Sequence, residues 1–161
     1  MNTMRTIVLA MALFTFGAGA AEKYTGPRPP KADVPYLLHA DNLVETEAIL
    51  AKQETRKDTQ VASLPGASSP AKTPLSEPIF LLRTQKLSAE KIEAYKMEVK
   101  NGNREVVVSQ KKGKGVAKPI YLVVTRLDEG LYKIEVDQPL ENGEYTLSPQ
   151  GSDETFSFQI Y

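Results

Sequence analysis

In the second half of the chain, apolar and polar residues alternate in short runs that are separated by turn sequences. Tyr95, Met97 and Val99 alternate with lysine and glutamate, and Asn101-Gly102 follows at once. Strict alternation places the apolar side chains on one face of a β-strand, and Asn-Gly between two such runs is a strong hairpin signal. The pattern recurs to the C-terminus and predicts about seven short strands, typical of an antiparallel β-sandwich or barrel.

The N-terminus predicts export. Residues 1–20 combine a short start with one positive charge, an apolar stretch and the small residues Ala18-Gly19-Ala20, which together describe a cleavable signal peptide. The apolar run is too short for a membrane span of about 20 residues, so the mature chain is not expected to cross a membrane. No cysteine is present for a lipid anchor or a disulfide. The expected location is the periplasm, the cell surface or the medium.

Charge argues against a nucleic-acid partner. The full chain has 20 basic and 20 acidic residues, and removal of residues 1–20 takes away only Arg5, which leaves 19 and 20 and a net charge of −1. A nucleic-acid-binding domain is expected to carry a basic face. No nucleic-acid partner is therefore predicted.

Proline and serine divide the rest of the chain into three predicted regions. Residues 21–57 are expected to form an extended arm rich in proline and then a short helix from Asn42, with Glu45 completing a capping box. Residues 58–77 are rich in Pro, Ser and Ala and predict a disordered linker. Residues 78–161 remain as the β-sandwich domain.

One motif adds detail to the predicted sandwich. Leu140, Gly143 and Tyr145 fit the pattern L-x-x-G-x-Y just ahead of a predicted strand. In Greek-key sandwiches a tyrosine at this place bonds to backbone a few residues upstream; Leu140 would plug the sandwich end, and Gly143 would allow a close approach. The alternative is an ordinary Asn-Gly hairpin with Tyr145 as a strand residue.

On this motif and the strand count, residues 78–161 resemble small exported bacterial proteins with an immunoglobulin-like or fibronectin-type β-sandwich. The two cysteines and the core tryptophan of antibody-type domains are absent. The resemblance implies a Greek-key sandwich of about seven strands. It implies no particular activity, because such sandwiches host many unrelated functions.

Reactive side chains are scarce. His39 is the single histidine and there is no cysteine, which excludes a multi-histidine zinc site and a cysteine nucleophile. The acidic pairs Asp128-Glu129 and Asp153-Glu154 lie in predicted turns, where solvated acids are common. No catalytic, cofactor-binding or metal-binding residue is predicted, no cofactor is expected, and the chain is not expected to be an enzyme.

Two segments are candidates for partner binding. Tyr36-Leu37-Leu38 form an apolar cluster in the extended arm, which would suit a groove or a sheet edge on a partner or would pack on the chain's own domain. Lys111, Lys112 and Lys114 lie in a glycine-containing segment that would meet an anionic partner or form a solvated loop.

The leading hypothesis is a non-enzymatic binding or structural module of the bacterial cell envelope that docks an envelope protein. Two alternatives stay open. A carboxylate-based enzyme or accessory acting on envelope polymers requires a cleft with two acids of raised pKa. A small-ligand carrier requires a cavity inside the β-structure, which an unbroken apolar core would exclude. The sequence does not give the oligomeric state or the identity of the partner.

Overall fold

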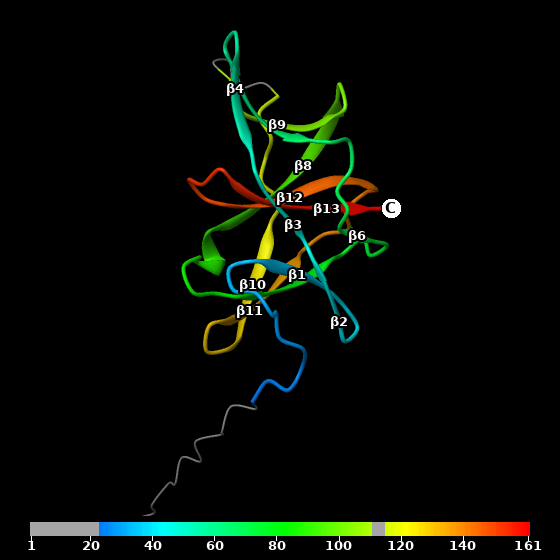
Figure 1. The fold of residues 1–161 in the computed structure, drawn as a ribbon, viewed down its shortest axis with the longest axis vertical. Coiled ribbons are helices and arrows are strands. Elements are labelled where there is room, and N and C mark those ends of the chain that lie inside the picture. Colours follow the sequence, from blue (N-terminus) through cyan, green and yellow to red (C-terminus); the bar gives the residue numbers. More distant parts are fainter. Residues whose placement is uncertain (1–22, 111–114) are drawn as a thin grey trace, which may run out of the picture.

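The computed structural model describes residues 23–110 and 115–161, and in these ranges the chain is all β apart from one 3-10 turn, η1 (Ala89–Lys91) (Figure 1). The expected signal peptide and the three lysines 111, 112 and 114 lie outside the described residues. The strands of the described ranges are β1 (Pro35–His39), β2 (Asn42–Glu45), β3 (Glu47–Leu50), β4 (Lys52–Arg56), β5 (Thr59–Pro65), β6 (Lys72–Thr73), β7 (Ile79–Arg83), β8 (Ile92–Lys100), β9 (Asn103–Gln110), β10 (Leu122–Asp128), β11 (Leu131–Val136), β12 (Gly143–Pro149) and β13 (Glu154–Ile160).

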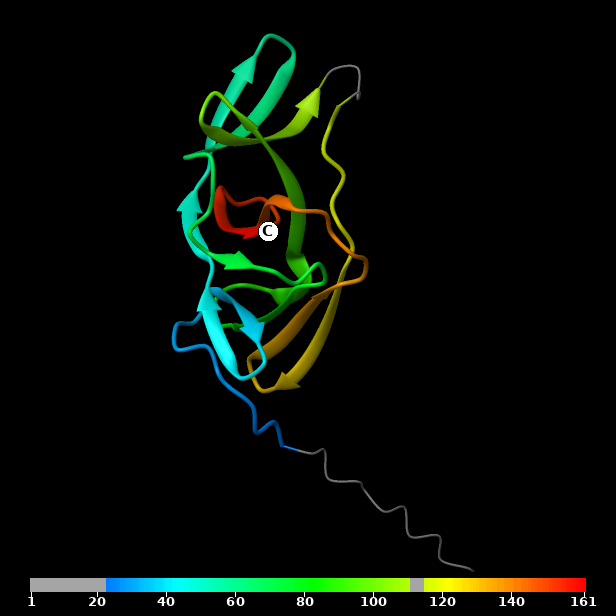
Figure 2. The ribbon, with the colours of Figure 1, turned by 90° about the vertical axis from the view of Figure 1, so that its right-hand side faces the viewer.

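The strands form two sheets in which all pairings but one are antiparallel. The five-stranded sheet has the order β10-β11-β7-β1-β2. The second sheet has the order β3-β13-β12-β8-β9-β5-β4, and the short β6 pairs with β13 in parallel. Figures 1 and 2 both show the five-stranded sheet at one end of the molecule, β12 and β13 in the middle, and the β4–β5 hairpin with β9 at the other end.

The second sheet closes on itself. Its order begins with β3 and ends with β4, yet these strands are consecutive in the chain and are separated by Ala51 alone. The Ala51 amide donates a hydrogen bond to the carbonyl oxygen of Asp153 at 2.8 Å. Strand β8 makes the opposite corner, because Ile92–Met97 pair with β12 and Glu98–Lys100 pair with β9. Strands that pass from one sheet to another form such corners in orthogonal β-structures. We call this closed sheet the ring sheet.

Strands β8, β12 and β13 are covered on both faces, so the molecule has two cores. Alternate residues such as Leu147 and Phe158 face the five-stranded sheet, where the rings of Phe80 and Phe158 meet edge to face with centroids 5.0 Å apart. The intervening residues face the interior of the ring sheet. There a smaller apolar cluster forms around Leu64 and Met97. The ring interior thus contains a second core, separate from the core between the two sheets.

The prediction of a helix from Asn42 is wrong. Residues 42–56 form β2, β3 and β4, which pair with β1, β13 and β5 respectively. A helix here would have had only a weak apolar stripe to bury, whereas each strand gains a neighbour that satisfies its backbone groups. Lys57 follows with a φ of 57° and allows the tight turn into β5.

The prediction of a disordered linker at residues 58–77 is also wrong over much of its length. Strand β5 lies between β4 and β9, with Val61, Ala62 and Leu64 buried. Ser69 is buried as well, and its hydroxyl donates to the carbonyl oxygen of Ser157 at 3.1 Å. The folded unit therefore does not begin at residue 78, because residues 35–65 supply strands to both sheets.

Candidate functional site

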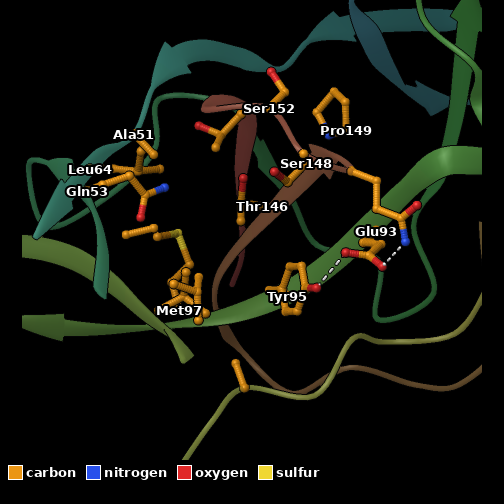
Figure 3. A pocket seen from close by; sticks show the side chains of 17 residues that line it. Ala51, Gln53, Leu64, Glu93, Tyr95, Met97, Thr146, Ser148, Pro149 and Ser152 are labelled. Carbon is orange, nitrogen blue, oxygen red and sulfur yellow. Dashed lines mark hydrogen bonds between the residues drawn. The ribbon is translucent and has the colours of Figure 1, made fainter. Parts of the chain in front are cut away.

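The interior of the ring sheet contains a cavity of about 190 Å³, partly open to solvent. Strands β4, β5, β8, β9, β12 and β13 all contribute to its wall, as does the turn between β12 and β13. Figure 3 shows the lining side chains converging on a common space. The wall exists because the ring closes at Ala51, which brings β4 and β5 opposite β12 and β13.

One end of the cavity is apolar. Leu64 is fully buried, and Ala62, Met97 and Val106 are nearly so; together with Ala51 they form the second core cluster. In Figure 3, Leu64 and Met97 lie on the same side of the cavity, away from Glu93. Alternation along the strands puts these side chains inward, since Tyr95 and Met97 share one face of β8.

The other end is polar and centres on Glu93. The Tyr95 hydroxyl donates to one carboxylate oxygen of Glu93 at 2.6 Å, and the side-chain amide of Gln150 donates to the other at 3.0 Å. Burial raises the pKa of the Tyr95 phenol to about 12, and the hydrogen bond to Glu93 adds to the shift. Tyr95 is therefore a neutral hydrogen-bonding group at physiological pH. Glu93 is half-buried and is the one charged side chain among the described residues that line the cavity.

Three hydroxyl groups along the wall donate to backbone carbonyl oxygens. Thr155 Oγ1 donates to the carbonyl oxygen of Ile49 at 2.7 Å, and Thr146 Oγ1 donates to that of Leu147 at 3.3 Å. Ser148 Oγ donates, at 3.5 Å, to the carbonyl oxygen of Glu154. A hydroxyl whose proton is used in this way keeps only acceptor capacity.

A buried arginine crosses the ring interior on the same inward face of β9 as Val106. Arg104 is deeply buried, and its Nη1 donates to Glu47 Oε2 at 2.6 Å and to Ser157 Oγ at 2.5 Å. Its remaining bonds go to the carbonyl oxygens of Pro65 and Gly66, at 2.8 and 3.0 Å. Gly66 has a φ of 83°, a conformation that favours glycine and lets the chain turn directly after β5.

Glu144, the second residue of β12, is also buried. Its Oε2 accepts a hydrogen bond from the amide of Ser69 at 3.0 Å, whereas Oε1 has no partner among the described residues. Neither Glu144 nor Arg104 lines the cavity. They belong to the polar network that ties β3, β9, β12 and β13 together.

The apolar residues expected to bind a partner, Tyr36, Leu37 and Leu38, do not lie in a free arm but in a strand of the folded sheet. Tyr36 and Leu37 are buried in β1, which lies between β7 and β2 in the five-stranded sheet, and Leu38 is half-buried. The Tyr36 hydroxyl donates to Glu45 Oε2 at 2.9 Å. The expectation of a free apolar anchor is wrong for Tyr36 and Leu37, because these side chains are used in the protein's own core.

The L-x-x-G-x-Y residues lie at the start of β12. The Tyr145 hydroxyl donates to the carbonyl oxygen of Glu141, four residues upstream, at 2.7 Å. Leu140 belongs to the core between the two sheets. A Cβ at Gly143 would lie 3.7 Å from the Tyr145 ring, an ordinary van der Waals distance, so no close approach requires glycine there.

Sequence reasoning missed the cavity residues. Ala51, Gln53, Ala62 and Leu64 fall in the segments assigned to a helix and a linker. The sequence does contain one short signal for a strand here. Between Thr59 and Pro65, the residues Val61, Ala62 and Leu64 are apolar, which is typical of a short buried strand.

The described residues contain no group of three or more His, Cys, Asp or Glu side chains placed to hold a metal ion. Within the same ranges no helix has the length and apolar character needed to cross a membrane. No family model, curated protein or solved structure matches the chain.

Proposed function

We propose that this is an exported, non-enzymatic binding protein of the cell envelope that holds a small ligand inside the ring sheet. The observation that carries the proposal is the cavity of about 190 Å³ between an apolar end at Leu64 and a polar end at Glu93. This partly open cavity is distinguished by its apolar end, which belongs to the buried cluster around Leu64 and Met97. An apolar pocket with a few convergent polar groups is the usual form of a small-molecule site.

The size of the cavity limits its occupant. An engineered apolar cavity of about 150 Å³ in another protein binds benzene. By the same measure, about seven or eight non-hydrogen atoms fit the space enclosed here. The ligand is thus a small molecule, or a short group of a larger molecule whose remainder extends past the polar rim.

Two other functions are less well supported. A paired-carboxylate enzyme needs two acids flanking one cleft, whereas Glu93 is the single carboxylate among the described residues that line the cavity. The described acids with clearly shifted pKa values are all shifted down, through ion pairs or hydrogen bonds: Asp33, Glu45, Glu54, Glu105, Asp128 and Glu141. Docking of a protein through the N-terminal arm is less well supported because Tyr36 and Leu37, the proposed contact residues, are buried.

The setting is part of the proposal. Export is supported by the signal-type sequence of residues 1–20. Kinship to immunoglobulin-like sandwiches of Greek-key order is supported by the Tyr145 bond to Glu141 and by two packed antiparallel layers.

The test uses hexan-1-ol as a neutral probe of seven non-hydrogen atoms. We expect residues 21–161 to bind it saturably, with amide shift changes in NMR spectra confined to the ring sheet. Ala62→Leu, which fills the apolar end, should weaken binding at least tenfold. Val99→Leu is the matched control, because Val99 is half-exposed on β8 and does not line the cavity. Absence of saturable binding, or equal binding by both variants, would overturn the proposed function.

A further inference from the structure

The charge of the cavity wall selects among possible ligands. Of the described residues that line it, Glu93 carries the one formal charge, and none is Lys, Arg or His. An anionic ligand would therefore lose its hydration without gaining a cation as partner, which is costly in a partly buried site. A cationic ligand also loses hydration but gains Glu93 as a partner, and a neutral ligand has no charge to desolvate.

The hydrogen-bonding capacity of the wall points the same way. Tyr95, Thr146, Ser148 and Thr155 all direct their hydroxyl protons to protein oxygens, and Ser152 Oγ accepts a bond from the amide of Glu154 at 3.0 Å. Of the five hydroxyls that line the cavity, four are thus left with acceptor lone pairs only. A ligand that contacts these four hydroxyls must supply the donors.

Glu93 has room for one more donor on each oxygen. An ionised carboxylate offers about four lone-pair positions, of which the bonds from Tyr95 and Gln150 use two. Those two bonds also fix the orientation of the carboxylate at the cavity rim. An ammonium group carries three donors and a positive charge, and charge-assisted bonds to a carboxylate are about twice as strong as neutral ones.

We infer that the ligand is a small amphipathic amine, whose ammonium group binds Glu93 at the rim and whose apolar chain occupies the end formed by Leu64 and Met97. This inference rests on the proposed function and adds the chemical class of the ligand. The cavity volume of about 190 Å³ suits a short alkyl or aryl group rather than a long acyl chain.

The test compares three probes with the same chain: hexylammonium, hexan-1-ol and hexanoate, titrated calorimetrically into residues 21–161. We expect hexylammonium to bind about tenfold more tightly than hexan-1-ol, with hexanoate the weakest. In the Glu93→Gln variant, the affinity for hexylammonium should fall to within about twofold of the affinity of the same variant for hexan-1-ol. Glu98→Gln is the matched control on β8, because Glu98 is exposed and pairs with Lys100 outside the cavity.

A second measurement does not depend on a variant. Raising the salt concentration from about 0.05 to about 0.5 M should weaken hexylammonium binding severalfold and leave hexan-1-ol unchanged. Binding of hexanoate as tight as that of hexylammonium, or an amine preference that survives Glu93→Gln, would overturn the ligand class while hexan-1-ol binding still upheld the proposed function. Failure of all three probes would overturn both.

Discussion

Arg104 Nη1 lies 2.6 Å from Glu47 Oε2, and this ion pair joins β9 to β3 across the interior of the ring sheet. The Arg104 side chain is 1% exposed and that of Glu47 is 22% exposed, so the cation is far more deeply buried than its partner. Breaking a buried pair by removing one member leaves the other charge uncompensated, and this usually costs more than the pair contributes.

We expect Arg104→Met to lower the free energy of unfolding by about 3–5 kcal/mol, because it removes a buried charge and the four hydrogen bonds that Arg104 donates to Glu47, Ser157, Pro65 and Gly66. Urea denaturation followed by circular dichroism measures the change. Lys96→Met is the control: Lys96 pairs with Glu141, and because both side chains are at least half-exposed, a loss of about 1 kcal/mol or less is expected. Equal losses in the two variants would contradict the structural role of Arg104.

The Tyr145 hydroxyl holds the chain that enters β12. Tyr145→Phe keeps the ring, which stacks on Phe158 with centroids 5.6 Å apart, and removes the bond to the Glu141 carbonyl oxygen. We expect a loss of about 1 kcal/mol in unfolding free energy, the usual value of one such bond. Tyr121→Phe should change stability by less than about 0.5 kcal/mol, since Tyr121 is 68% exposed. The two variants are compared by chemical denaturation at neutral pH.

Asp33 links the N-terminal arm to the turn after β7. Its carboxylate accepts bonds from the amides of Gln85, Lys86 and Leu87 at 2.8–3.2 Å. Burial by itself raises the pKa of Asp33, but the three amides outweigh burial and hold the pKa below its ordinary value. A depressed folded-state pKa gives stability that is complete above the unfolded value, near 3.9, and is lost as pH falls through the folded value.

Asp33→Asn should therefore destabilise the protein at pH 7 by about 1–2 kcal/mol and make it less sensitive to acid. Melting temperatures between pH 7 and pH 2.5 test this: the wild-type and variant curves should converge as the pH falls below about 4. Asp41→Asn, at an exposed aspartate, removes the same charge and serves as the control. Curves that stayed parallel down to the lowest pH would contradict the role given to Asp33.

Local patterns predicted the strands whose partners are near in sequence. The Asn101-Gly102 signal is confirmed: both residues have positive φ, and Lys100 pairs with Asn103 to join β8 and β9. Strand β3 was missed because its partner, β13, is remote in sequence. Glu47 pairs with Ser157, and a polar strand gains its stability from such pairing rather than from its own composition.

The cavity was missed for a related reason. Along β12, Tyr145 and Leu147 alternate with Thr146 and Ser148, a pattern that normally indicates one core face and one solvent face. Here the polar face lines the interior of a closed sheet. Alternation fixes which residues share a face, but whether a second layer covers the polar face depends on the closure of the ring.

One backbone bond contributes to that closure at the corner between β3 and β4: the Ala51 amide donates to the Asp153 carbonyl oxygen at 2.8 Å. Ala51→Pro removes this donor, whereas Ala51→Gly keeps it and removes only the methyl group. Proline should cost about 1–3 kcal/mol of stability through the unsatisfied carbonyl and weaken hexan-1-ol binding severalfold, because the wall formed by β4 and β5 is no longer held against β13. Glycine should cost about 1 kcal/mol or less and keep most of the affinity. Urea denaturation and NMR titration of both variants measure these effects, and a proline variant as stable and as competent in binding as the glycine variant would show that the ring is held closed elsewhere.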